Sequence, residues 1–161
     1  MKSIFNSTTL SAAGVSADTS LGRAATMRSN LLEMTHDAEE AVLRPKDFGA
    51  FDHKLRAALA ARIANLNGEF KLAEQYIDEA GTFRPIADPK NDGVAYDLSP
   101  VLSFMDKVAM NTSNVVADDI SRLQEAEVSD ADIVRLSELN SFLAYQIRLI
   151  VGLRLMREND S

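Results

Sequence analysis

Apolar side chains recur at helical spacing along most of the chain, and no segment alternates as a strand would. Pro45 and Gly68 stand where two of the apolar stripes stop, as helix-ending residues do. The pattern predicts helices over residues 20–43, with a break near 27–30 left open, and over 51–66, 69–80, 99–110, 117–126 and 130–157. We therefore expect an all-α fold of about six helices.

The two ends of the chain differ from its middle. Residues 1–19 are rich in Ser, Thr, Ala and Gly, and we expect an extended arm or loose tail there, followed by a single domain over 20–161. Between Phe142 and Met156, eleven of fifteen residues are apolar and lie on every side of the predicted helix. A helix that is apolar all round is buried all round. We expect it to be the central helix or to be shared with a second subunit.

Arg148 is a charged residue inside that apolar segment. A charge in apolar surroundings needs a partner. Arg148 either forms an internal ion pair with an acidic residue or, with Tyr145, supplies polar groups to a pocket. We favour the ion pair, because buried ionic groups serve structure more often than chemistry.

The overall charge narrows the range of partners. The chain of 161 residues has a net charge of −7, which disfavours binding to nucleic-acid backbones and to anionic membranes. No run of about 20 apolar residues could span a bilayer, and the first residues do not resemble a secretory signal, so we expect a cytoplasmic protein. The chain has no cysteine, which excludes disulfides, thiolate metal sites and thiol catalysis.

Candidate chemistry elsewhere is sparse. His36, Glu39 and Glu40 share one helix face, a spacing that could hold a divalent metal, but the favoured interpretation is a solvated polar face. The scattered glycines form no phosphate-binding loop, and no nucleophile motif is present. We expect neither a cofactor nor a metal.

One stretch carries a resemblance to a known family. The segment LRAALAARIANLNGEFKLAEQY, residues 55–76, resembles the signature region of the carboxymuconolactone decarboxylase and alkylhydroperoxidase-D-like superfamily, including Arg62 and the break at Asn67-Gly68. Farther along, the superfamily pattern is matched by Phe142, Tyr145, Arg148 and Gly152. The resemblance covers about residues 51–155. It implies an alkylhydroperoxidase-D-like helical bundle with a long, buried C-terminal helix.

The residues of the family's peroxidase site are replaced in this chain. Members carry two cysteines in C-x-x-C, a histidine four residues later and a glutamate twelve residues before the first cysteine. The corresponding positions here are Ala57 for the glutamate, Glu69 and Leu72 for the cysteines, and Tyr76 for the histidine. The resemblance therefore implies the fold without thiol peroxidase activity. It is closest to the cysteine-lacking first domain of tandem peroxidase-related proteins.

Two functions of different kinds follow from the resemblance. The favoured one is a non-catalytic scaffold that forms a homo-oligomer (dimer, trimer or hexamer) or associates with a cysteine-bearing homologue, with a role in antioxidant defence. The alternative is a decarboxylase- or isomerase-like acid–base enzyme in which Glu69 is the base, with Tyr76 or Lys71 nearby. A redox enzyme that borrows a thiol from another chain is a third and fainter alternative.

Overall fold

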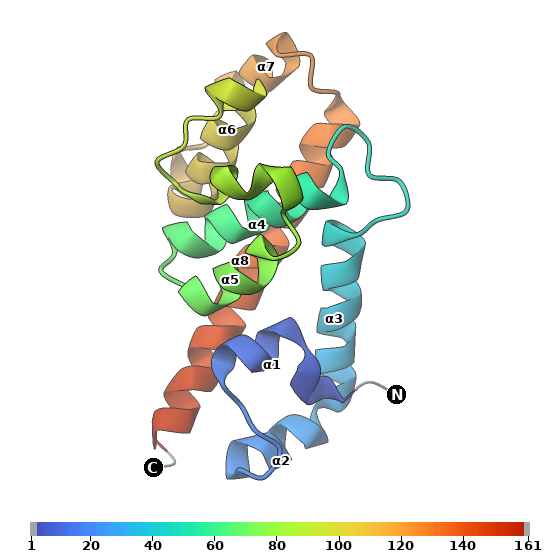
Figure 1. Ribbon diagram of the computed structural model, residues 1–161, viewed down its shortest axis with the longest axis vertical. Helices are drawn as coiled ribbons and strands as arrows, with labels where there is room; N and C mark the ends of the chain where they lie inside the picture. The colour runs from blue at the N-terminus through green and yellow to red at the C-terminus, as the bar shows by residue number, and fades with distance from the viewer. Residues whose placement is uncertain (1–2, 160–161) are drawn as a thin grey trace.

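Helices provide all the regular secondary structure of residues 3–159, the part of the chain that the computed structural model describes (Figure 1). The α-helices are α1 (Thr8–Ala13), α2 (Ser20–Met27), α3 (Ser29–Leu43), α4 (His53–Leu66), α5 (Phe70–Ile77), α6 (Ser99–Met110), α7 (Ala117–Glu125) and α8 (Asp130–Asn159). The 3₁₀ helices are η1 (Ile4–Asn6), η2 (Gly81–Ala87), η3 (Val94–Tyr96) and η4 (Thr112–Asn114). The predicted all-α fold class is confirmed, and none of these helices is long and apolar enough to cross a membrane.

Each predicted helix is present, and the break near residue 28 is real. Arg28 separates α2 from α3 in a non-helical conformation. The cap of α2 is Thr19, whose hydroxyl accepts from the Gly22 N–H at 2.9 Å. The long helix α8 begins as expected, with the Asp132 N–H donating to the Ser129 hydroxyl at 3.2 Å.

The expected extended arm is wrong for residues 3–19. Ser7 caps α1, the left-handed Gly14 ends it, and the helix packs on α5 and α8. Leu10 is fully buried and Ala13 is 1% exposed. A six-residue helix shows too little periodicity to be found in sequence, and the burial of its apolar face holds it in place. Residues 1 and 2 of the predicted arm lie outside the described residues.

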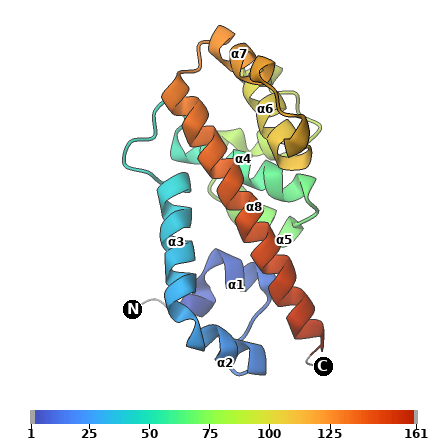
Figure 2. The same ribbon diagram turned by 180° about the vertical axis from the view of Figure 1, so that it is seen from behind.

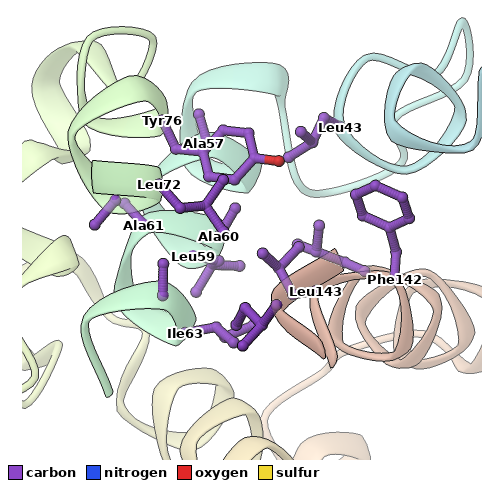
Figure 3. Close-up of a cluster of buried hydrophobic side chains, with 14 of the residues drawn as sticks. Leu43, Ala57, Leu59, Ala60, Ala61, Ile63, Leu72, Tyr76, Phe142 and Leu143 are labelled. Carbon is purple, nitrogen blue, oxygen red and sulfur yellow. The ribbon is translucent and has the colours of Figure 1, made fainter. Parts of the chain in front are cut away.

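Helix α4 forms the centre of the bundle, where it contacts α5, η2, α6 and α8. Its alanine-rich sequence lets these neighbours approach closely, and it contributes much of the buried cluster in Figure 3. Helix α5 presents Leu72, Ala73 and Tyr76 to this cluster. The sequence pattern places Phe70 on one face of this helix with Ala73 and Ile77, but Phe70 is 65% exposed, because the helix begins at Phe70 and its rotation turns that side chain outward.

Two buried arginines of α4 hold the irregular segments that flank it. The Arg56 guanidinium donates to the carbonyl oxygens of Val42, Phe48 and Phe51 at 2.8–3.0 Å. Arg62 donates to four carbonyl oxygens between Ile86 and Asn91 and to both carboxylate oxygens of Asp106. Residues 82–98, which contain most of η2 and all of η3, are therefore an ordered segment.

Helix α8 runs along one side of the bundle rather than through its centre (Figure 2). Its 30 residues span about 45 Å. Leu139, Leu143 and Ile150 are fully buried on its inner side, whereas Leu155 and Met156 are 57% and 54% exposed. The expectation that α8 is buried all round within one domain is wrong, because no other element of residues 3–159 covers its outer side. The shared subunit that the sequence offered as the alternative remains a prediction.

Candidate functional site

The residues that correspond to the superfamily's peroxidase site lie around the turn between α4 and α5. Asp52 caps α4 by accepting from the Leu55 N–H at 2.8 Å. At the other end, Gly68 has φ of 73° and supports a turn that the Glu69 N–H closes on the Ala64 carbonyl at 2.9 Å. This geometry follows from the Asn67-Gly68 pair and fixes where α5 starts.

Glu69 is a buried carboxylate held by one cation. It is 5% exposed, and its two oxygens accept from Arg154 Nη1 at 3.1 Å and Nη2 at 2.6 Å. These hydrogen bonds raise the pKa of the Arg154 guanidinium above its ordinary value. The pair ties the start of α5 to the last turns of α8. A carboxylate held by such a bidentate pair stabilises the fold, and the geometry does not favour Glu69 as a general base.

Tyr76 lies in the core of the bundle. Its side chain is 1% exposed, and its hydroxyl donates to Gln146 Oε1 at 2.7 Å. Burial, and then the negative charge of Glu39, raise the pKa of the Tyr76 phenol well above its usual value. The phenol therefore stays neutral, as a hydrogen-bond donor inside the protein.

The other two positions of the corresponding site are apolar and buried. Ala57 is 2% exposed and Leu72 is fully buried. Figure 3 shows both with Tyr76 in one cluster that also contains Leu43 and Leu143. Three of the four positions thus come together, but as packed core. Glu69 is directed instead to Arg154.

A buried polar cluster next to Tyr76 was missed in the sequence. Glu39 is 2% exposed, and its carboxylate accepts from the Thr8 hydroxyl at 2.6 Å and from Gln146 Nε2 at 3.2 Å. The same Gln146 amide nitrogen donates to the Thr9 hydroxyl at 3.3 Å. We call these residues, Thr8, Thr9, Glu39, Tyr76 and Gln146, the Glu39 cluster. It joins α1, α3, α5 and α8 through side-chain hydrogen bonds.

Burial dominates the electrostatics of Glu39. It raises the pKa of the carboxyl, while the Thr8 hydrogen bond and the charges of Arg44 and His36 act in the opposite direction. No cation is in hydrogen-bond contact with this carboxylate within residues 3–159. The donors are neutral hydroxyl and amide groups, so the cluster stabilises an ionised carboxylate less well than an arginine would.

The expected solvated face of His36, Glu39 and Glu40 is therefore wrong for Glu39. His36 is exposed and lines an open cavity of about 340 Å³ beside residues 3–8, and Glu40 pairs with Arg44 at 2.6 Å. Over residues 3–159, no group of three or more His, Cys, Asp or Glu side chains is arranged to hold a metal ion.

The burial of Glu39 could have been predicted from the sequence. The buried side of α3 consists of Leu32, Thr35, Glu39 and Leu43, at steps of three, four and four residues.

Arg148 and Tyr145 do not form one pocket. The expected internal ion pair of Arg148 is wrong, since the side chain is exposed and lines a small hollow of about 70 Å³ with Asn67 and Asn140. Tyr145 is 48% exposed, and its hydroxyl shares a 2.8 Å hydrogen bond with the Thr35 hydroxyl. Two other arginines of α8 pair with buried carboxylates instead, Arg154 with Glu69 and Arg135 with Asp132.

Tyr145 lines a second, apolar depression between α2, α3 and α8. This groove has a volume of about 260 Å³. Its lining includes Leu21, Leu31, Leu149, Leu153 and Met156, and among charged residues only Arg28. We refer to it as the apolar groove.

Comparisons with protein-family models, curated proteins and solved structures found no match to this chain.

Proposed function

We propose that this chain is a non-catalytic helical protein that acts by associating with another protein chain. The observation that carries the proposal is the exposed apolar surface around the apolar groove. Leu31, Tyr145 and Met156 line the groove with exposures of 41%, 48% and 54%. Contiguous exposed apolar surface on a protein marks an interaction site, and methionine adapts its shape to a partner.

The polar residues of the corresponding peroxidase site support the same function. Both Glu69 oxygens are engaged by Arg154, and the Tyr76 hydroxyl is engaged by Gln146. Ala57 and Leu72 offer no group for proton or electron transfer. The functional groups at these positions therefore stabilise the fold, and the exposed groove is the better candidate for function.

The proposal also includes a family. We propose that the chain is a cysteine-free member of the carboxymuconolactone decarboxylase and alkylhydroperoxidase-D-like superfamily with that helical fold. Support comes from the α4–turn–α5 unit at the residues that carry the resemblance. The partner is then a second copy of the chain or a cysteine-bearing homologue in the cytoplasm, and through the homologue the chain serves antioxidant defence.

Sedimentation velocity over a micromolar concentration series tests the association. We expect the wild-type chain to associate with itself or, when mixed, with a cysteine-bearing superfamily protein. Met156→Glu should weaken the complex by placing a charge in the apolar groove. Met110→Glu is a matched control on α6, because Met110 is 54% exposed and does not line the groove.

Two results would overturn the proposal. One is peroxide turnover by the chain alone, since the proposed protein has no redox group. The other is a chain that stays monomeric at high micromolar concentration and sediments separately from the cysteine-bearing protein.

A further inference from the structure

The outer side of α8 carries a regular stripe of exposed residues. The stripe comprises Val134, Glu138, Ser141, Tyr145, Arg148 and Gly152, all exposed. Successive members are four, three, four, three and four residues apart. This alternation is the spacing of a helix face that packs lengthwise along another helix. Figure 2 shows α8 in front of the other helices, with this side of the bundle open along its length.

The stripe is complementary to itself when one copy is turned end over end. If two α8 helices run antiparallel and cross level with Leu143, Glu138 of each copy faces Arg148 of the other. In the same register, Val134 faces Gly152 and Ser141 faces Tyr145. The two-fold arrangement therefore contains two contacts between Glu138 and Arg148 and two contacts between Val134 and Gly152. A two-fold axis requires this kind of self-complementary surface.

Two residues of the stripe, Glu138 and Arg148, are charged. Neither Glu138 nor Arg148 forms a hydrogen bond or an ion pair within residues 3–159. Other arginines of α8 are engaged, including Arg135 with Asp47 and Arg154 with Glu69. Glu138 and Arg148 are therefore available to a second molecule.

Gly152 is an independent sign of a close neighbour. It lies inside α8, where glycine costs about 1 kcal/mol relative to alanine. A Cβ atom added at Gly152 would meet nothing within 4 Å, so no contact inside the chain explains the glycine. A helix of another molecule crossing at this position would explain it, because the missing side chain leaves room for Val134, which is 56% exposed.

We propose that two copies of this chain form a two-fold dimer in which the α8 helices pack antiparallel through the stripe. Two equivalent ion pairs, each between Glu138 and Arg148 of the other copy, set the register. The inference rests on the proposed function, since it names a second copy as the associating partner. Ala131 and Leu155, which are also exposed, extend the same register by one further pair at each end.

Charge reversal tests the register. Sedimentation velocity should show a dimer for the wild type at micromolar concentration. Glu138→Arg and Arg148→Glu should each weaken dimerisation at least about tenfold, because each sets like charges against each other twice. The double variant E138R/R148E should restore the dimer, since the opposite charges then face each other again. Far-UV circular dichroism confirms that each variant folds, and Glu74→Arg makes the same charge change on the exposed side of α5.

Cross-linking tests the direction, because the chain has no cysteine to interfere. Ala131→Cys and Leu155→Cys chains, mixed and oxidised, should form a disulfide between the two kinds of chain. Neither chain alone should cross-link, since the two copies of position 131 lie about 36 Å apart along antiparallel helices. A parallel pair would instead cross-link Ala131→Cys to itself.

The outcomes separate this inference from the proposed function. A dimer that is lost in Met156→Glu but unaffected by both charge reversals would overturn the α8 register and leave association through the apolar groove standing. A dimer that the double variant fails to restore also overturns the register. A monomeric wild type that binds a cysteine-bearing homologue overturns the dimer alone.

Discussion

Two buried charged residues organise this bundle, and they are held in opposite ways. Arg62 is 3% exposed and Glu39 is 2% exposed. Arg62 has an anionic partner in Asp106, at 2.6 and 2.7 Å, and donates to four backbone carbonyls. Glu39 has only neutral donors in contact, from Thr8 and Gln146. The guanidinium is compensated by a full opposite charge, whereas the carboxylate is not.

The difference shows what each residue contributes. The Arg62 guanidinium gives a long irregular segment the hydrogen-bond donors that a helix or sheet would otherwise supply. This segment therefore needs the guanidinium in order to fold. Glu39 joins four helices through hydrogen bonds that a neutral group could also accept. We therefore expect the loss of the arginine to be costly and the neutralisation of the carboxylate to be favourable.

Arg62→Met should have the largest effect on stability. Removing the guanidinium leaves Asp106 without its partner and four carbonyl oxygens without their donor, and we expect a loss of about 3–5 kcal/mol in the free energy of unfolding. Urea unfolding followed by circular dichroism measures it. Arg122→Met is the matched control, because Arg122 forms an exposed ion pair with Asp118, whose contribution is small. Equal stabilities of the two variants would contradict the role given to Arg62.

Arg154→Met should have the next largest effect. It leaves Glu69 buried without a cation, which we expect to cost about 2 kcal/mol. The double variant Glu69→Met and Arg154→Met should be more stable than Arg154→Met alone, because the unpaired carboxylate is then gone as well. A double-mutant cycle by urea unfolding measures this coupling. Additive losses would show that the pair does not act as a unit.

The pattern of the sequence predicted helices better than it predicted the neighbours of each helix. The turn at Gly68 follows from local chemistry and was predicted, whereas the break at Arg28 was left open. Phe70 was predicted on the wrong side of α5. The direction of each side chain in a short helix depends on the first helical residue, and the sequence predicts that residue less well than it predicts the helix itself. The outer side of α8 was predicted to be buried, because apolar composition does not tell a core from an interface.

The candidate site was predictable in position but not in its contacts. The resemblance located Glu69 and Tyr76, but their partners, Arg154 and Gln146, lie 85 and 70 residues away in the chain. Only the fold brings such residues together. Glu39 could have been found from its place in the apolar stripe of α3. Thr8, its partner, lies in a segment whose helix is too short to show in the pattern.

Tyr76→Phe should lower the free energy of unfolding by about 1–2 kcal/mol. The phenyl ring fills the same space, but Gln146 Oε1 loses the donor that reaches it at 2.7 Å. Urea unfolding measures the change. Tyr96→Phe is the matched control, because the Tyr96 hydroxyl forms no hydrogen bond within residues 3–159. A Tyr76→Phe protein as stable as this control would show that the Glu39 cluster does not need the phenol.

Glu39→Gln should have the smallest effect and the opposite sign, with a gain of about 1 kcal/mol near pH 7. An amide can donate to the Thr8 hydroxyl and accept from Gln146, so the hydrogen bonds survive without the buried charge. The pH dependence gives the sharper test. In the unfolded chain the carboxyl titrates near pKa ~4.3, and burial raises its pKa in the folded protein. Between the two pKa values the folded state keeps a proton that the unfolded state releases.

The stability that the protonated Glu39 carboxyl contributes is therefore complete below the unfolded pKa and is lost as the pH rises through the folded pKa. Glu39→Gln has no such proton, so its advantage over the wild type should be near zero at acid pH and should grow toward neutral pH. Urea unfolding of both proteins at a series of pH values measures this advantage. Glu33→Gln makes the same chemical change at an exposed position of α3 and is the matched control. An advantage that stays constant or shrinks as the pH rises would mean that Glu39 is compensated as fully as Arg62, and the contrast between the two residues would fail.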